Sequence, residues 1–261
     1  MKILLVSLCI FMNSVHAMKI DRVIVSTDAN PKYYQFWPLV AQAWKQLVGI
    51  QPTVIFIGDE DFPIDTTCGD VIRFKPIEGI STALQAQVIR LFAGVYFPNE
   101  VFLISDMDMI PCSRSYYVDS VSKIPEDRFV IYRGKYDGVY PMCYIATKGF
   151  VANEMFKVHS VEDIVERIKE WEAIGFGWNT DQILLTRIAP PWGAQTGKVV
   201  FLEHGIDGRV DRLDWEHRGR WLHNRKALRQ GKYIDAHLLR PMNDHWEENM
   251  EVVRDLGIHY P

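Results

Sequence analysis

The sequence lacks most of the features that assign a protein to a class at first sight. Its net charge is −4 over 261 residues, so no strong basic field favours nucleic acid and no nucleic-acid partner is expected. It has four cysteines and no C-x-x-C pair, so cysteine spacing does not settle the redox compartment. No N-x-Ser/Thr sequon occurs, which disfavours a eukaryotic luminal protein. Repeats, low-complexity tracts and clean linkers are also missing, so a single domain is the simplest account.

The chain has no apolar run long enough for a membrane-spanning helix. Its N-terminal run, residues 3–12, is too short to cross a bilayer, so no transmembrane span is expected. Lys2 before this run and Val15-His16-Ala17 after it are typical of a secretory signal peptide. Alternatively, Met18 is the true start and residues 1–17 are an artefact of start-site choice. The first alternative predicts the secretory pathway and the second the cytoplasm, and both stay open.

What is present indicates a globular α/β protein. Hydrophobic residues make up 48% of the chain and charged ones 24%, a composition that supports a substantial core. Runs rich in β-branched residues predict strands, and apolar residues at helical spacing predict helices. The expected strands cover residues 21–26, 53–57, 71–74 and 101–104, and the expected helices cover 34–48 and 81–97. Buried strands alternating with helices predict an α/β/α sandwich around a mostly parallel, mixed sheet.

The second half of the chain has a less regular pattern. Further strands are expected over 129–132, 142–147 and 199–202, and further helices over 161–171 and 182–187. From His204 onward, polar turns alternate with aromatic residues. Eight tryptophans and eleven tyrosines are many for this length, and they suit either a site for sugar-like ligands or an aromatic core.

The run VFLISDMDMIP, Val101 to Pro111, carries the strongest functional signal. Its first four residues predict a buried strand, which ends where Ser105 begins the polar segment. In an extended backbone residues i and i+2 share a face, so the Asp106 and Asp108 carboxylates are expected to point the same way. Two such carboxylates repel each other unless a cation lies between them, and oxygen ligands suit Mg²⁺ or Mn²⁺. Pro111 is expected to bar further strand hydrogen bonding.

Two further polar spots lie where strands end or helices begin. Thr27 and Asp28 follow the first strand, and a doubly wound topology places them near the same sheet edge as Asp106. Asp181 and Gln182 follow a loop of small residues. A carboxylate there either bonds a substrate hydroxyl or caps the helix that follows.

Basic residues could bind an anionic ligand at the same edge. Arg90 lies on the flank of the predicted helix 81–97, where it is either solvated or aimed at a phosphate. His237 precedes Arg240 by three residues, so an imidazole for a metal and a guanidinium for a phosphate could act together. A lone histidine is more often a core or surface residue than a ligand.

These residues resemble the GT-A glycosyltransferases, which use nucleotide-sugar donors. The resemblance spans most of the chain from Ile20 onward, and its most specific piece is LISDMDMIP after the strand–helix–strand order. The segments W-N-T-D-Q and H-L-L-R-P add support. The resemblance implies a GT-A-type fold over residues 18–261, with a nucleotide-sugar-binding half at 18–111 and an acceptor-binding half at 112–261.

Within that family, glycogenin-like and related retaining enzymes imply roles for individual residues. The residues expected to bind the donor are Thr27, Asp28, Arg90, Ser105 and Arg240; those expected to bind Mn²⁺ or Mg²⁺ are Asp106, Asp108 and His237; and those expected beside the reacting sugar are Asp181 and Gln182. The family's late motif has a glycine and Lys-Pro-Trp after its histidine. Here His237 and Pro241 fit, Arg240 stands in place of the lysine, and the glycine and the adjacent tryptophan are missing.

The expected reaction is transfer of a sugar to a glycan, lipid or protein acceptor. Cleavage of the anomeric C–O bond leaves a nucleoside diphosphate with growing negative charge. A divalent cation would stabilise this leaving group as a Lewis acid, and Arg240 would add a second positive contact. Asp181 would position a substrate or support an oxocarbenium-like centre. No second carboxylate stands out as the base that inversion needs, which favours retention.

Two other functions remain open from the sequence. Haloacid-dehalogenase-like phosphatases also carry D-x-D after a strand, but that motif usually opens the chain and is followed by Thr or Val where Ile110 stands here. A non-catalytic carbohydrate-binding module with Ca²⁺ is the other alternative, although no EF-hand-like Gly and Glu follow Asp108.

Overall fold

A seven-stranded sheet forms the centre of the molecule. The computed structural model describes residues 16–205, 208–210 and 224–260, so most of the proposed 1–17 leader lies outside the described residues. The sheet contains β1 (Arg22–Asp28), β2 (Gln51–Ile57), β3 (Asp70–Phe74), β4 (Val101–Ile104), β6 (Phe129–Arg133), β7 (Ile145–Lys148) and β8 (Val199–His204). Their order is β3-β2-β1-β4-β7-β6-β8, and only β7 runs antiparallel to its neighbours. The predicted mixed, mostly parallel sheet is confirmed.

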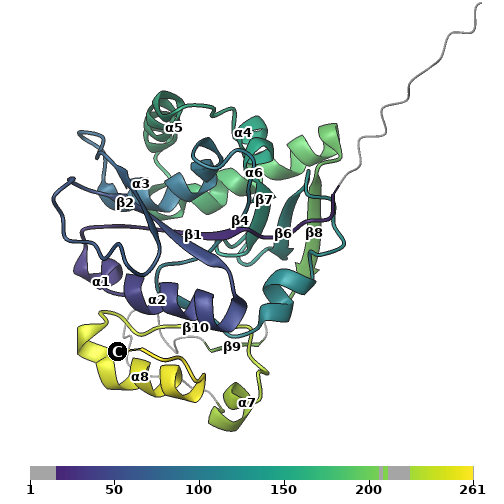
Figure 1. Ribbon diagram of the computed structural model, residues 1–261. Coiled ribbons are helices and arrows are strands. Elements are labelled where there is room, and N and C mark those ends of the chain that lie inside the picture. The colour runs from purple at the N-terminus through teal and green to yellow at the C-terminus, as the bar shows by residue number, and fades with distance from the viewer. Residues whose placement is uncertain (1–15, 206–207, 211–223, 261) are drawn as a thin grey trace, which may run out of the picture.

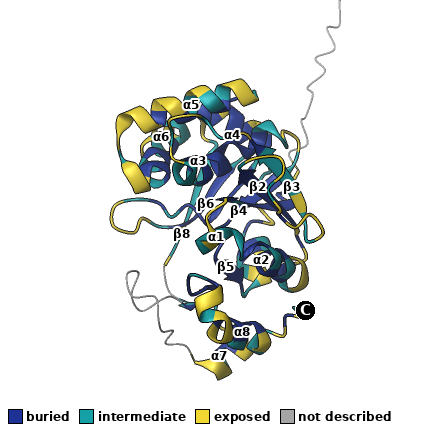
Figure 2. Ribbon diagram, turned by 90° about the vertical axis from the view of Figure 1, so that its left-hand side faces the viewer, coloured by how far each residue is buried: buried dark blue, intermediate teal, exposed yellow. Residues whose placement is uncertain are grey.

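Helices cover both faces of this sheet, which confirms the α/β/α sandwich. One face carries α1 (Pro31–Tyr34) and α2 (Trp37–Ala43), and the other carries α3 (Thr82–Ile89), α4 (Gly149–Phe156), α5 (Val161–Ile174) and α6 (Thr180–Thr196). Each face has its own apolar cluster, and the inner strands between them are buried, whereas the edge strands β3 and β8 are half-buried (Figures 1 and 2). None of the described helices has the length and apolar character that crossing a membrane requires.

The first half follows the predicted elements, with changes in the helices. The helix expected over 34–48 is divided into α1, α2 and a π-helical turn at Trp44–Val48. Pro38 lies in the first turn of α2, where its missing N–H is tolerated, so the chain starts a new helix there. The helix expected over 81–97 is α3 followed by a 3₁₀ turn, Arg90–Val95. β4 has the predicted bounds.

The second half departs further from expectation. α4 was not predicted, and β7 starts at Ile145 instead of residue 142. The helix expected over 182–187 is the longer α6, which starts at Thr180 and so contains Asp181 and Gln182 in its first turn. The expectation that the Asp181 carboxylate caps this helix is wrong: the N-cap residue is Asn179, without a side-chain hydrogen bond.

A small second sheet and two helices lie below α2 (Figure 1). The sheet contains β5 (Met109–Pro111), β10 (Asp235–His237) and β9 (Arg209–Val210), in that order, and the helices are α7 (Arg225–Arg229) and α8 (Trp246–Asp255). The expectation that Pro111 bars strand pairing is wrong, because β5 pairs antiparallel with β10. Proline is accommodated because it is the last residue of a short edge strand. This pairing brings the tail of the chain to the end of β4.

Candidate functional site

The chain turns sharply after β4. The Ser105 N–H donates to the carbonyl of Ile24 over 3.0 Å, and the Met109 N–H donates to the carbonyl of Asp106 over 3.3 Å. The second bond closes a turn, so residues 106–108 are not extended, and the premise that Asp106 and Asp108 share a strand face is wrong. This turn takes the chain from β4, in the central sheet, to β5, which pairs with β10 in the small sheet.

A buried arginine holds two carboxylates together at this turn. Arg90 contacts Asp106 at 2.5 Å and Asp181 at 3.4 Å, and its guanidinium donates to the carbonyl of Ser105 over 2.8 Å. Arg90 is only 6% exposed, so the alternative that its side chain is solvated is wrong. The 3₁₀ turn after α3, the end of β4 and the start of α6 each supply one of these side chains. The expected donor contact of Arg90 stays a prediction.

The two carboxylates titrate in opposite directions. Burial alone would raise the pKa of Asp106, but Arg90 and His237 hold that pKa well below its usual range. Burial raises the pKa of Asp181 to about 6, although Arg90 opposes the shift. Three features of the geometry explain the difference: Arg90 is closer to Asp106 than to Asp181, His237 also lowers the pKa of Asp106, and the Asp106 charge raises the pKa of Asp181. Asp106 is therefore a permanent anion, and Asp181 changes charge near neutral pH.

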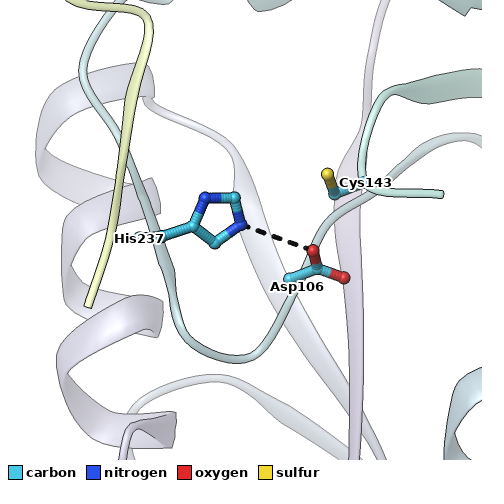
Figure 3. Close-up of side chains that lie close together, drawn as sticks. All are labelled: Asp106, Cys143 and His237. Carbon is cyan, nitrogen blue, oxygen red and sulfur yellow. Dashed lines mark ion pairs between the residues drawn. The ribbon is translucent and has the colours of Figure 1, made fainter. Parts of the chain in front are cut away.

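Asp106, Cys143 and His237 form a cluster of metal-binding side chains. One ligand atom from each lies within 4.8 Å of the others. Figure 3 shows a ring nitrogen of His237 aimed at the Asp106 carboxylate, with the Cys143 sulfur beside it. That nitrogen, Nε2, is 3.6 Å from the Asp106 oxygen. Cys143 and His237 are buried, whereas the Asp106 side chain keeps 30% of its surface exposed, so the cluster opens to solvent at Asp106.

Asp108 lies beside the tail segment through a different residue. Its carboxylate is 3.4 Å from a guanidinium nitrogen of Arg240, and the same nitrogen donates to the hydroxyl of Tyr33. The N–H of Leu238 donates to the Asp108 carbonyl over 2.7 Å. Among the described residues, the Arg240 Nε has no hydrogen-bond partner although it is buried. Such a group suits an additional anionic ligand.

The other predicted residues take defined places around this centre. Asp28 accepts hydrogen bonds from the Asn30 N–H over 3.1 Å and the Thr82 hydroxyl over 2.8 Å, and Thr27 is buried. They end β1, which is parallel to β4 and adjacent to it, so they lie at the same sheet edge. Ser105 is fully buried, and its carbonyl accepts a hydrogen bond from Arg90. Gln182 is half-buried, one residue after Asp181.

Sequence reasoning missed Cys143 and the residues beneath His237. Asp235 is fully buried and accepts hydrogen bonds from Tyr144 over 2.6 Å and from Arg209 over 3.1 Å. Arg209 also contacts the ring nitrogens of His237. Asp235 is two residues before His237 in a strand, so the D-A-H pattern places both side chains on one face; this signal was available. No comparable signal identified Cys143.

These donors fit a divalent ion, but they differ from an all-oxygen set. Mn²⁺ and Mg²⁺ prefer carboxylate and other oxygen ligands. Asp106 is accompanied by a nitrogen and a sulfur donor, while Asp108 is engaged by Arg240. The identity of the ion, and the role of Asp108 as a ligand, stay predictions.

No family model matches the chain, and no curated protein matches it. Many solved structures are similar to it, and two of them each share 12% sequence identity with it. One is a glycosyltransferase involved in the glycosylation of the major capsid of PBCV-1, with a TM-score of 0.43 over 88% of this chain and 99% of that chain. The other is the glycosyltransferase GlyE of Streptococcus pneumoniae TIGR4, with a TM-score of 0.45 over 94% of this chain and 65% of that chain.

Proposed function

We propose that the protein is a metal-dependent glycosyltransferase of the hexosyl type, which moves a sugar from a nucleoside-diphosphate-sugar to an acceptor. The observation that carries the proposal is that His237 lies beside Asp106, and Arg240 beside Asp108, in the turn after β4. Ligands of open α/β sheets bind at the carboxyl ends of the strands, especially where the strand order reverses. β1 and β4 are adjacent there, and the chain order reverses between them.

The charges at this edge suit a diphosphate leaving group. Arg240 keeps a buried N–H without a protein partner among the described residues, and that N–H can donate to a phosphate oxygen. A divalent ion held by Asp106 and His237, with Asp108 as a further candidate ligand, would supply Lewis-acid stabilisation of the diphosphate. Thr27 and Asp28 lie farther along the edge, where a nucleoside joined to that diphosphate would extend.

Asp181 and Gln182 are the proposed contacts of the reacting sugar. Asp181 is held by Arg90 next to Asp106, so it lies close to the proposed diphosphate site. Its pKa of about 6 lets it accept or donate a hydrogen bond to a sugar hydroxyl near neutral pH. Retention of anomeric configuration remains part of the proposal, and the acceptor is a glycan, lipid or protein.

Donor hydrolysis tests this function without knowledge of the acceptor. The chain is incubated with nucleoside-diphosphate-sugars of each base, with divalent ions or with chelator. The expected result is slow, ion-dependent release of a nucleoside diphosphate from one donor, lost in Asp106→Asn and kept in the surface variant Asp119→Asn. Release of phosphate from simple monoesters would indicate a phosphatase instead. Donor binding without cleavage by the wild type would indicate a carbohydrate-binding module.

A further inference from the structure

We propose that Cys143 is a protein ligand of the metal ion, and that its sulfur makes the site select zinc-like ions over Mn²⁺ and Mg²⁺. This inference rests on the metal site of the proposed function but not on its sugar chemistry. Cys143 precedes β7, the strand paired with β4, so the sheet itself places its sulfur beside Asp106. Zinc accepts oxygen, nitrogen and sulfur donors, and its catalytic sites keep three protein ligands with a fourth position open.

The geometry allows this coordination after a small adjustment. The three donor atoms lie within 4.8 Å of one another. Around a tetrahedral zinc ion with ordinary bond lengths, donor atoms are separated by about 3.5 Å. The His237 and Asp106 atoms, 3.6 Å apart, already have this separation, so any contraction concerns the distances to the Cys143 sulfur. The Asp106 side chain is the exposed member of the cluster. Its exposed side is also the route by which an ion enters.

Arg209 sets the condition for the ion to bind. A guanidinium has only donors, so its contact with the His237 ring uses a nitrogen lone pair. Coordination through Nε2, which faces Asp106, requires a proton on Nδ1, and that proton cannot face a donor. Arg209 must therefore turn away from His237 when the ion binds. It keeps a partner when it does so, because its Nε donates to Asp235 over 3.1 Å.

Ligation would also change the charge of the Cys143 thiol. Coordination to a divalent ion deprotonates a cysteine outright, and the thiol proton passes to solvent. The Asp106 carboxylate, the Cys143 thiolate and the ion together leave no net charge at the centre. A negatively charged donor phosphate can then take the open position without repulsion from an excess of protein anions.

Cobalt spectroscopy tests the proposal with the metal alone. Co²⁺ is added to chelator-treated full-length protein, and a sulfur-to-cobalt charge-transfer band is sought in the near ultraviolet. The band should appear in the wild type and disappear in Cys143→Ser. Zn²⁺ affinity in Cys143→Ser, measured by competition with a chelating dye, should fall by at least about 100-fold, whereas Mn²⁺ affinity should change by less than about threefold.

Two controls make the result independent of whether Cys143→Ser folds. Cys112→Ser changes a half-buried thiol near β5 that is not in the cluster, and the band should persist. A variant with serine at Cys9, Cys68 and Cys112 leaves Cys143 as the only thiol in the sequence, and it too should keep the band. Calorimetric binding of Co²⁺ without a band would overturn the role of Cys143 and leave the proposed function standing. Failure of the wild type to bind any divalent ion would overturn both.

Discussion

Arg90 determines the chemistry of two carboxylates at the scale of single residues. It contacts Asp106 at 2.5 Å and Asp181 at 3.4 Å; the Asp181 side chain is buried, whereas the Asp106 side chain is partly exposed. The nearer carboxylate stays ionised, while burial raises the pKa of the farther one to about 6. Pairs of acidic groups with separated pKa values are typical of sites where one residue carries charge and the other exchanges a proton.

We predict that Asp181→Asn gains stability relative to the wild type as the pH rises. The folded-state pKa of about 6 exceeds the ordinary value of 3.8, so the folded protein binds this proton more tightly than the unfolded chain does. The wild type therefore loses stability as the pH rises from about 4 to about 6, and the asparagine variant lacks this loss. The difference in free energy of unfolding should move by about 3 kcal/mol in favour of the variant.

Urea unfolding of both proteins across this pH range, with chelator present, measures that difference. Asp119→Asn is the matched control, because Asp119 forms an exposed ion pair with Arg114. The free energy of unfolding of Asp119→Asn should stay within about 0.5 kcal/mol of the wild-type value at every pH in this range. A pH-independent difference for Asp181→Asn would contradict the assignment of a raised pKa.

Residue types at the site were largely predictable, whereas their partners were not. The carboxylates, His237 and Arg240 stand out in the sequence because they follow strands or lie close together. The partners of Arg90 lie 16 and 91 positions away, so its burial depends on the tertiary fold. Cys143 has neither a partner nor a motif nearby in the sequence, and only the pairing of β7 with β4 places it beside Asp106.

At the scale of elements, α8 holds the segment that carries His237 and Arg240. Asn249 of α8 is fully buried, accepts a hydrogen bond from the Leu239 N–H over 2.9 Å, and donates one to the Leu239 carbonyl over 3.0 Å. These two bonds satisfy backbone groups that β10 leaves unpaired at its end. The position of the tail residues thus depends on one side chain of a helix outside the central sheet.

Asn249→Ala should lower the free energy of unfolding by roughly 3 kcal/mol, because it leaves a buried N–H and a buried carbonyl without partners. Glu247→Ala on the same helix is the control, since Glu247 forms an exposed ion pair with Arg254. Glu247→Ala should lower the free energy of unfolding by less than about 1 kcal/mol. Equal losses for the two variants in chemical unfolding would show that Asn249 does not anchor the segment.

Elements with long periodic patterns were predicted, and short ones were not. The strands of the central sheet and α3, α5 and α6 have enough apolar residues to reveal their spacing, although the observed ends of several of them differ from the predicted ends. β5 and β10 have three residues each, too few for any period, and they form because they pair with each other and β10 also pairs with β9. The turn at Asp106–Asp108 follows from that pairing, and so it was mistaken for extended chain.

At the scale of the whole molecule, two distant parts of the chain meet at one edge. The parallel order of β1, β2 and β4 sends their carboxyl ends to the same side. The small sheet then brings the tail across to the end of β4, as Figure 1 shows for β10 below the central sheet. The α/β class was predictable because it depends on element order, whereas this crossing depends on a pairing between residues far apart in sequence.

The central claim is that Asp106 holds a divalent ion to which a diphosphate binds. Calorimetric titration of nucleoside diphosphates into the full-length protein, with and without divalent ion, tests it most directly. We expect binding that requires the ion, is lost in Asp106→Asn and persists in Asp119→Asn, with both variants folded by circular dichroism. Binding of equal affinity without the ion, or undiminished ion-dependent binding by Asp106→Asn, would contradict the account.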